Sequence, residues 1–308
     1  MTSFQCSALK HVGLSNIIHY PGDDTYESRV NAYWSRVAHK RPYCLVRPTN
    51  TSEVVETVNA IVQTPGCNFA VRSGGHVAWG ASAIDDGIAI DLGAMNSTTY
   101  NPETGLASIE PGARWENVYQ VLEPQGVNVA GGRDGDVGVA GLLLGGGISW
   151  YSPRVGFACD QVQNFEIVLA DGRVVNANEQ ENADLWQACK GGTFNFGIVT
   201  RFDMRTLPAE PVWGGVIVSD RSTGPAQLRA LTNFNDKLES HPNSSFVLLW
   251  NYSPQLKSIV TSRFVVNTRG IEDPEELQET LAIPKMFGEP KISTILAFAQ
   301  DCIQPYGY

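Results

Sequence analysis

The amino-acid sequence predicts an α+β protein made of two parts. Over residues 1–204, apolar residues at helical spacing alternate with short runs of strand-forming residues. Two prolines within residues 207–211 then interrupt regular structure, and strand patterns dominate the remainder. A chain of 308 residues also suits two domains and buries roughly 75% of its unfolded surface without disulfide bonds. We therefore expect one part over residues 1–208 and a second over residues 209–308.

The first part is expected to hold amphipathic helices that cover a sheet. One helix begins with Thr51 or Ser52 as its cap, carries a stripe of valines and an isoleucine, and ends before Pro65. Another follows from the apolar spacing between Trp115 and Leu122. The remaining expected elements are a helix over residues 26–39 and strands over residues 43–46, 68–72, 87–92, 106–110, 165–170, 173–177 and 198–204.

A β-hairpin is predicted where Asp171–Gly172 separates two strand patterns, because this dipeptide favours a tight two-residue turn. The second part shows no internal repeat and no heptad pattern. Its expected elements are strands over residues 215–219, 246–251 and 259–266, helices over residues 226–238 and 274–281, and an apolar segment over residues 292–299.

Charge and hydropathy exclude two classes of partner. The chain has 22 basic and 32 acidic residues, a net charge of −10, which repels phosphate backbones and anionic membranes. Glycines interrupt the most apolar stretch, residues 137–148, so no membrane-spanning segment is expected. The first twenty residues show no basic region followed by an apolar run, which favours a cytoplasmic location by default without excluding secretion.

The six cysteines are scattered and lack the spacing of a zinc site. We expect most of them to be buried free thiols. Cys44 and Cys67 flank one predicted helix and can end on neighbouring strands, so they form the one pair considered for a disulfide.

The first of three glycine clusters directly follows a predicted strand and reads Arg72-Ser73-Gly74-Gly75-His76. Adjacent glycines permit positive φ angles and present no Cβ, so successive backbone N–H groups can converge on an anion such as a pyrophosphate. This geometry suits a dinucleotide cofactor. A plain glycine turn carrying a surface histidine is the alternative interpretation of the motif taken alone.

The second cluster combines closely spaced glycines with apolar packing residues. Val137 and Gly138 begin it, and Gly141, Gly145 and Gly146 follow. Backbone of this kind can lie flat against a planar ligand while the leucines between the glycines anchor it. The spacing is not that of the dinucleotide fingerprint, the nucleotide P-loop or the hydrolase elbow. A tight packing loop is the alternative.

The third cluster carries aromatic residues Phe194 and Phe196 and runs through Gly197, Ile198 and Val199 into a strand. Turns alone do not account for three glycine-rich loops that each adjoin a predicted strand within about 130 residues. Together the three clusters predict one elongated binding groove.

The three glycine clusters, in this order, resemble the motifs of the FAD-linked oxidases of the vanillyl-alcohol oxidase superfamily. The segments that carry the resemblance are 72–76, 137–138 with 145–147, and 196–200. The most similar branch is the berberine-bridge-enzyme-like oxidoreductases, including fungal 6-hydroxynicotine-oxidase-like members, and the resemblance runs from about Tyr43 to Leu207. It implies a PCMH-type, two-subdomain FAD-binding fold over residues 1–208, with a core at about 40–208. An incomplete antiparallel-sheet substrate domain over residues 209–308 would follow, because the chain is shorter than is usual in the family.

The resemblance also implies a chemistry. His76 matches the histidine that bonds covalently to the 8α-methyl group of FAD, and this bond favours hydride acceptance by the ring. Asp134 stands where doubly linked relatives have a cysteine, so one tether is expected. Val137 matches a position beside flavin C4a, where a small side chain accompanies oxygen reactivity; a plain packing valine is the alternative.

The implied reaction is hydride transfer from a small organic molecule, such as an alcohol or amine of specialised metabolism, to flavin N5. Molecular oxygen would then reoxidise the flavin and release hydrogen peroxide. No catalytic base is identified. Trp79, Trp150 and Trp213 can lie near the ring or substrate, although a core position is commoner for tryptophan. The alternatives for the whole protein are a redox-silent FAD-binding protein, a flavin-scaffolded cyclase, or an α/β binding module without flavin.

Overall fold

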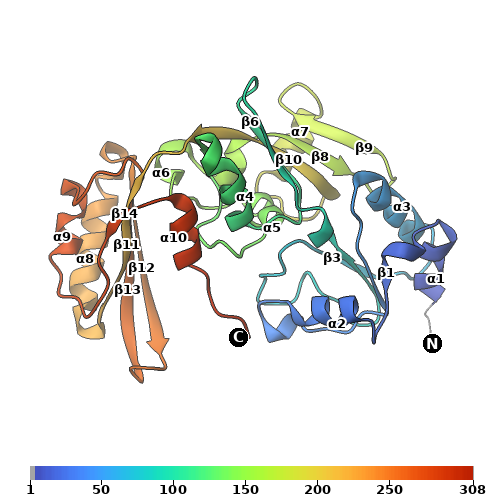
Figure 1. Cartoon of the computed structure of the whole chain (residues 1–308), viewed down its shortest axis with the longest axis horizontal. Helices are drawn as coiled ribbons and strands as arrows, with labels where there is room; N and C mark the ends of the chain where they lie inside the picture. Colours follow the sequence, from blue (N-terminus) through green and yellow to red (C-terminus); the bar gives the residue numbers. More distant parts are fainter. Residues whose placement is uncertain (1–3, 308) are drawn as a thin grey trace.

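The computed structural model describes residues 4–307 and contains three β-sheets, arranged along the long axis of the molecule (Figure 1). The first sheet has the strand order β1-β2-β4-β3, with parallel pairing of β2 and β3 to β4 and antiparallel pairing of β1 to β2. Helix α3 packs Val54 and Val58 against Ile88 and Ile90 of this sheet. The elements of this region are α1 (Phe4–His11), β1 (Ile18–His19), α2 (Asp24–Asn31), β2 (Cys44–Val46), α3 (Thr51–Val62), β3 (Phe69–Arg72) and β4 (Ile88–Asp91).

The second sheet is antiparallel, with the order β5-β6-β10-β8-β9, and β7 pairs with the far end of β10. Trp115 of α4 is fully buried with Phe165 and Phe202 of the sheet. The elements are β5 (Thr98–Asn101), β6 (Leu106–Ile109), α4 (Trp115–Leu122), β7 (Val127–Val129), α5 (Val139–Leu144), α6 (Ser152–Val155), β8 (Val162–Val168), β9 (Val174–Asn178), α7 (Ala183–Cys189) and β10 (Ile198–Pro208).

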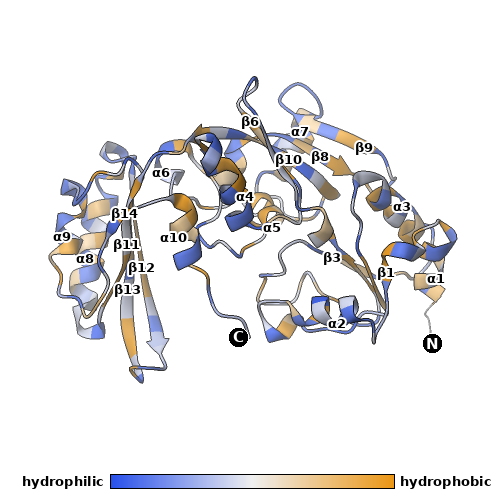
Figure 2. Cartoon of the chain, viewed as in Figure 1, coloured by the Kyte–Doolittle hydropathy of each residue, from blue (hydrophilic) through white to orange (hydrophobic). Residues whose placement is uncertain are grey.

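The third sheet is antiparallel with the order β12-β13-β11-β14, and α8 and α9 cover one of its faces (Figure 1). Figure 2 shows mixed apolar and polar colour along α4 and α8, as expected for helices with one buried side. The elements are β11 (Val212–Asp220), α8 (Gly224–Asn235), β12 (Ser244–Ser253), β13 (Ser258–Asn267), α9 (Gln278–Leu281), β14 (Lys291–Ser293) and α10 (Ile295–Asp301).

The polypeptide passes from the second sheet to the third between Pro208 and Val212. The chain then returns, because α10 packs against α4 and the amide of Gly135 donates a hydrogen bond to the carbonyl oxygen of Ala299 at 2.8 Å. The predicted α+β architecture with antiparallel sheets is confirmed. The division into domains 1–208 and 209–308 stays a prediction.

Two local predictions differ from the structure. The helix expected over residues 26–39 ends at Asn31, because the amide of Trp34 bonds to the carbonyl oxygen of Gly75 at 3.1 Å and draws the chain towards the first glycine cluster. Helix α3 is capped by Asn50, whose side chain accepts from the amide of Glu53 at 3.0 Å, and not by Thr51 or Ser52. A third prediction holds in part. The hairpin forms at the predicted place, but its turn is longer than the two residues expected, because the amide of Leu169 donates to the carbonyl oxygen of Arg173 at 2.9 Å and Val168 lies opposite Val174.

No helix within residues 4–307 is long and apolar enough to cross a bilayer.

The disulfide prediction was wrong in its partner. Cys6 in α1 bonds to Cys44 in β2, and Cys67 is a free, half-buried thiol whose pKa burial raises. Helix α1 packs against α3 and so brings Cys6 to the strand, a contact that spacing alone does not reveal. Disulfides persist mainly in oxidising compartments. The cytoplasmic location expected by default stays a prediction.

Replacing Cys6 by serine is expected to lower the free energy of unfolding by about 2–4 kcal/mol, because the bond closes a long loop in the unfolded chain. Urea denaturation of oxidised protein measures the change. Cys67→Ser is the matched control and should leave the midpoint unchanged. Equal destabilisation by both substitutions would contradict the Cys6–Cys44 pairing.

A buried carboxylate holds the first sheet to α2. Asp91 accepts hydrogen bonds from Nε and Nη2 of Arg29 at 2.6 and 3.0 Å, and Arg72 lies 3.8 Å away. Burial opposes the charge of Asp91, but the hydrogen bonds and charge of Arg29, with that of Arg72, hold the pKa of Asp91 below its ordinary value. Its stabilising effect is therefore complete above the unfolded pKa of about 3.9 and is lost as the pH falls through the folded value.

We expect Asp91→Asn to destabilise the protein by about 3–5 kcal/mol at pH 7, because it leaves buried guanidinium groups uncompensated. The difference in the free energy of unfolding between variant and wild type should become smaller as the pH is lowered below about 4. Thermal unfolding followed across this range checks the prediction. Asp171→Asn is the control, because it removes an exposed ion pair and should leave the stability nearly unchanged. A loss of stability in Asp91→Asn that does not depend on pH would contradict the role given to the Asp91 carboxylate.

Candidate cofactor site

The first glycine cluster is anchored from below by the side chain of Arg72. This side chain is fully buried. Its Nη2 donates to the carbonyl oxygen of Ala32 at 2.7 Å, and its Nη1 donates to the carbonyl oxygen of Arg29. Its guanidinium carbon lies over the ring of Tyr33, 3.9 Å from the ring centroid. Arg72 therefore presents only its main chain to the site. The Oγ of Ser73 donates to the carbonyl oxygen of Pro111 at 2.6 Å and fixes the next residue.

The first and second clusters touch through their backbones. A Cβ on Gly74 would lie 2.5 Å from the amide nitrogen of Gly138, and a Cβ on Gly138 would lie 2.6 Å from the Cα of Gly74. Only glycine fits at either position, because any side chain would separate the loops. The structure therefore brings together two motifs that lie more than 60 residues apart in the sequence.

Arg114 holds these two loops together, and the sequence did not single it out. Its Nη2 donates to the carbonyl oxygen of Gly74 at 3.1 Å, and its Nη1 lies 2.7 Å from the carboxylate of Asp136 and donates to the carbonyl of the same residue. Arg114 also forms a β-bridge with Gly138. An arginine directly before a helix carries no motif, so no sequence signal points to this clamp.

His76 ends the first cluster and is half-buried. Its imidazole stacks on the indole of Trp34 with a centroid distance of 4.6 Å and an interplanar angle of 15°. The carbonyl oxygen of Trp34 accepts a hydrogen bond from the amide of Gly307 at 2.9 Å, so the C-terminal segment reaches this loop. Tyr306 in that segment donates to the carboxylate of Asp136. Neither Trp34 nor Tyr306 was identified from the sequence.

Asp134, the residue at the position of the second tether in doubly linked relatives, is half-buried near His76. Burial raises the pKa of Asp134, against the opposing effects of the Asp136 amide and of His76. Among the residues that the structure describes, no group of histidines, cysteines and carboxylates is arranged to hold a metal ion.

The second cluster presents open backbone. Gly141 lies in α5 and Gly146 follows it with a φ of +94°, and a Cβ on either residue would meet nothing within 4 Å. Gly145 is likewise exposed. Val137 is partly buried against the core of the second sheet. Its position beside the flavin stays a prediction. Glycine backbone with free space above it is the surface that a planar cofactor can approach closely.

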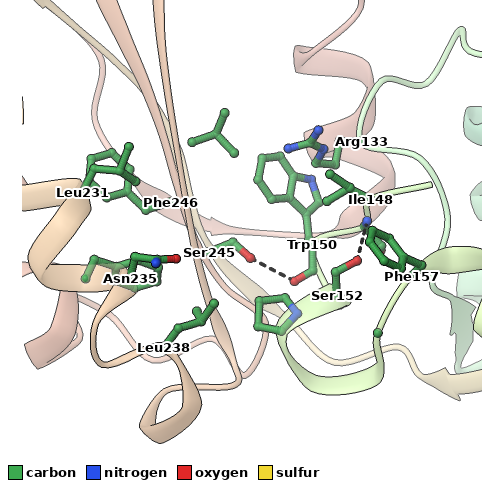
Figure 3. Close-up of a pocket in the computed structure, with 15 residues that line it drawn as sticks. Arg133, Ile148, Trp150, Ser152, Phe157, Leu231, Asn235, Leu238, Ser245 and Phe246 are labelled. Atoms are coloured by element: carbon green, nitrogen blue, oxygen red, sulfur yellow. Dashed lines mark hydrogen bonds between the residues drawn. The ribbon is translucent and has the colours of Figure 1, made fainter. Parts of the chain in front are cut away.

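The segment after the second cluster forms one wall of a cavity, which we name the sheet-edge cavity. Its volume is about 440 Å³, and its other walls are α8 and the edge strand β12 (Figure 3). The lining is mostly apolar and includes Ile148, Trp150, Phe157, Phe234 and Phe246. Of the three tryptophans considered from the sequence, Trp150 is thus a cavity wall, Trp213 is a core residue, and Trp79 is 77% exposed.

The third cluster meets the second through one backbone hydrogen bond, from the amide of Thr193 to the carbonyl oxygen of Leu144 at 2.9 Å. A Cβ on Gly197 would lie 2.5 Å from the carbonyl oxygen of Val168, which explains the glycine at the start of β10. Ile198 and Val199 are buried and belong to two different cores. The three clusters therefore form a contiguous series, with Ile198 and Val199 packed beneath it.

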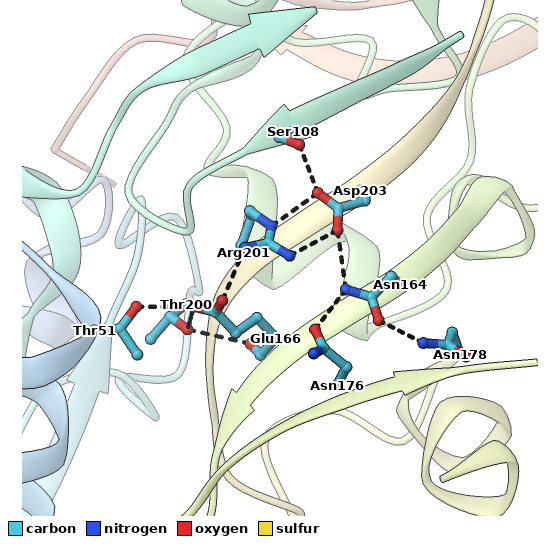
Figure 4. Close-up of polar contacts among 9 residues, drawn as sticks. All are labelled: Thr51, Ser108, Asn164, Glu166, Asn176, Asn178, Thr200, Arg201 and Asp203. Atoms are coloured by element: carbon cyan, nitrogen blue, oxygen red, sulfur yellow. Dashed lines mark hydrogen bonds and ion pairs between the residues drawn. The ribbon is translucent and has the colours of Figure 1, made fainter. Parts of the chain in front are cut away.

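A polar network fixes the strand that follows the third cluster (Figure 4). Glu166 of β8 accepts from the hydroxyls of Thr51 at 2.8 Å and Thr200 at 2.7 Å, which joins α3 to the second sheet. Arg201 bridges Glu166 at 2.8 Å and Asp203 at 2.9 Å. Burial opposes the charge of Asp203, but Arg201 and other donors hold its pKa below the ordinary value. These contacts position the third cluster, and each of the three charges has a partner.

The fold and the backbone-lined series of glycines agree with those of an FAD-binding domain. Residues 42–178 match the family model described as an FAD binding domain, so the chain contains this domain. The chain is 38% identical over 307 residues to the FAD-dependent monooxygenase sdcF of Emericella nidulans. The aligned region covers 98% of this chain and 64% of that protein. The resemblance stated from the motifs is confirmed.

Two solved structures share the fold. The 6-hydroxy-D-nicotine oxidase of Arthrobacter nicotinovorans matches with a TM-score of 0.81 at 22% identity, over 94% of this chain and 64% of that one. A variant of berberine bridge enzyme matches with a TM-score of 0.80 at 17% identity, over 97% of this chain and 65% of that one. The chain thus spans less than two thirds of the length of these relatives.

Gly138→Ala should separate the first two loops, cost about 1–3 kcal/mol of stability and lower the amount of bound FAD. Gly141→Ala is the matched comparison, because its Cβ enters open space within a helix and should stabilise the apoprotein by about 0.5–1 kcal/mol. If FAD lies against Gly141, this variant still retains less flavin. Unfolding curves and flavin absorbance measure both effects, and full flavin retention by Gly141→Ala would remove that residue from the site.

Proposed function

We propose that this chain is the FAD-binding part of an oxidase that takes a hydride from a small organic molecule and passes the electrons to molecular oxygen, releasing hydrogen peroxide. The observation that carries the proposal is the backbone contact between Gly74 and Gly138, which brings the loop of His76 against the loop that continues to the open glycine backbone of the second cluster. The relatives named as FAD-dependent monooxygenases and oxidases support it. An alcohol or amine of specialised metabolism is the substrate class we infer from that resemblance.

The glycine backbone fits FAD. Main-chain amides at Gly74, Gly75 and Gly138 would bind the pyrophosphate and adenine portion, as main-chain amides do at other anion sites. Free space above Gly141 and Gly146 admits a flat ligand without displacing a side chain. When bound, FAD supplies the two-electron acceptor that the side chains of this protein lack.

His76 is the residue we propose for the covalent tether. The stack on Trp34 fixes the plane of its imidazole and leaves the ring edge, which carries both nitrogens, free to bond. Arg114 keeps the loop of His76 against the second cluster through the carbonyl of Gly74. Asp134, which has no thiol to offer, leaves a single point of attachment.

Acid precipitation of FAD-loaded protein tests the tether. We expect flavin fluorescence in the protein pellet of the wild type and its loss to the supernatant in His76→Ala, because acid releases only noncovalent flavin. His39→Ala is the matched control and should keep its flavin in the pellet. Wild-type flavin found wholly in the supernatant would refute the covalent bond while leaving FAD binding intact.

Peroxide formation distinguishes an oxidase from a redox-silent FAD-binding protein or a flavin-scaffolded cyclase. A loaded protein that releases hydrogen peroxide with a screened set of alcohols and amines supports the oxidase. Flavin that is bound yet never reduced by any member of the set would favour the silent alternative.

A further inference from the structure

Arg133 is a cation without a counter-charge on the wall of the sheet-edge cavity. Its side chain is half-buried and makes neither a hydrogen bond nor an ion pair within residues 4–307. Its guanidinium lies 5.3 Å from the ring centroid of Trp150. Figure 3 shows the two side chains next to one another. Burial lowers the pKa of Arg133, which reflects the cost of keeping this charge away from water. A half-buried, unpaired guanidinium is a group that an anionic ligand can satisfy.

A second unsatisfied donor belongs to the same wall. Trp150 is only 4% exposed, and its indole N–H has no hydrogen-bond partner in the described part of the chain. The carbonyl oxygen of Trp150 accepts from the hydroxyl of Ser245 at 3.2 Å, so β12 holds the main chain of Trp150. A buried donor left without an acceptor costs about 1–3 kcal/mol. Because less than 1 Å² of this nitrogen is accessible, a ligand oxygen reaches it only with a shift of the ring, and Arg133 is the donor that the cavity presents directly.

The remainder of the cavity is complementary to an aromatic body. Phe157, Phe234 and Phe246 contribute ring surfaces from three different elements. Two polar groups at the lining are already engaged, because Ser245 donates to Trp150 and Ser152 accepts from the amide of Ser149 at 2.9 Å. Among the described residues, those that line the cavity include no aspartate or glutamate. A volume of about 440 Å³ lies within the usual range of small-molecule sites.

We propose that the sheet-edge cavity binds an aromatic carboxylate, with the carboxylate on the Arg133 guanidinium and the aromatic ring of the ligand among the phenylalanines. The protein as a whole carries a net charge of −10, so a local cation is needed to attract an organic anion. Arg133 lies in the loop that continues to Val137 and Gly138. That this ligand is the substrate of the enzyme rests on the proposed function. The binding site itself does not depend on the proposed function.

Isothermal titration calorimetry with naphthoate and with the neutral naphthylmethanol tests the site in the full chain. Naphthoate should bind at least about tenfold more tightly than the alcohol, since charge-assisted hydrogen bonds discriminate by this amount or more. Arg133→Gln should remove the preference and leave binding of the alcohol unchanged, which also shows that the cavity is folded. Arg133→Lys should restore part of the preference for the anion.

Arg154→Gln is the matched control, because Arg154 stacks on Tyr151 in the neighbouring segment but does not line the cavity. It should bind naphthoate as the wild type does. Equal affinity for the acid and the alcohol, or an unaltered preference in Arg133→Gln, overturns the inference. Flavin content is measured on the same samples. Naphthoate binding without flavin would refute the proposed function alone, and flavin without naphthoate binding would refute this inference alone.

Discussion

The close approach of two backbones, at Gly74 and Gly138, is the constraint on which the rest of the site depends. The first loop leaves the first sheet after β3, and the second opens α5 against the core of the second sheet. Without a side chain at either glycine the loops share one surface, and Arg114 holds them there through a carbonyl of one and a carboxylate of the other. The same contact brings the loop that carries His76 against the second loop.

The return of the chain from the third sheet adds a second constraint. Helix α10 packs against α4, and the segment after it bonds to Trp34 and Asp136, which lie beside His76 and in the second loop respectively. The third sheet is thereby connected at both ends to the region that carries the glycine clusters. This double connection gives the sheet-edge cavity walls from α8, from β12 and from the segment after Gly147.

The predictions of helices, turns and the disulfide were accurate where the deciding contact joins residues close together in the sequence, and wrong where it joins distant segments. The hairpin at Asp171–Gly172 and the helix over Thr51–Val62 were predictable, because turn chemistry and an apolar stripe act within a few residues. The helix expected over residues 26–39 was too long, since a hydrogen bond to Gly75 draws Trp34 out of it. The partner of Cys44 was mistaken because helix packing, and not spacing, selects Cys6.

Within the site, the three glycine clusters could be found from sequence because the need for positive φ or close approach restricts the residue type itself. Composition and motif order therefore determined the α+β fold, the FAD-binding class and the loops concerned. Arg114, Trp34 and Tyr306 could not be found in this way, since their partners lie tens of residues away or more along the chain. The unpaired Arg133 could not be found either, because the sequence does not show which arginine lacks a partner. Only tertiary packing decided which loops touch, which cation lacks a partner and where the cavity opens. These features depend on distances between residues that are far apart in the sequence, and local sequence patterns do not reveal such distances.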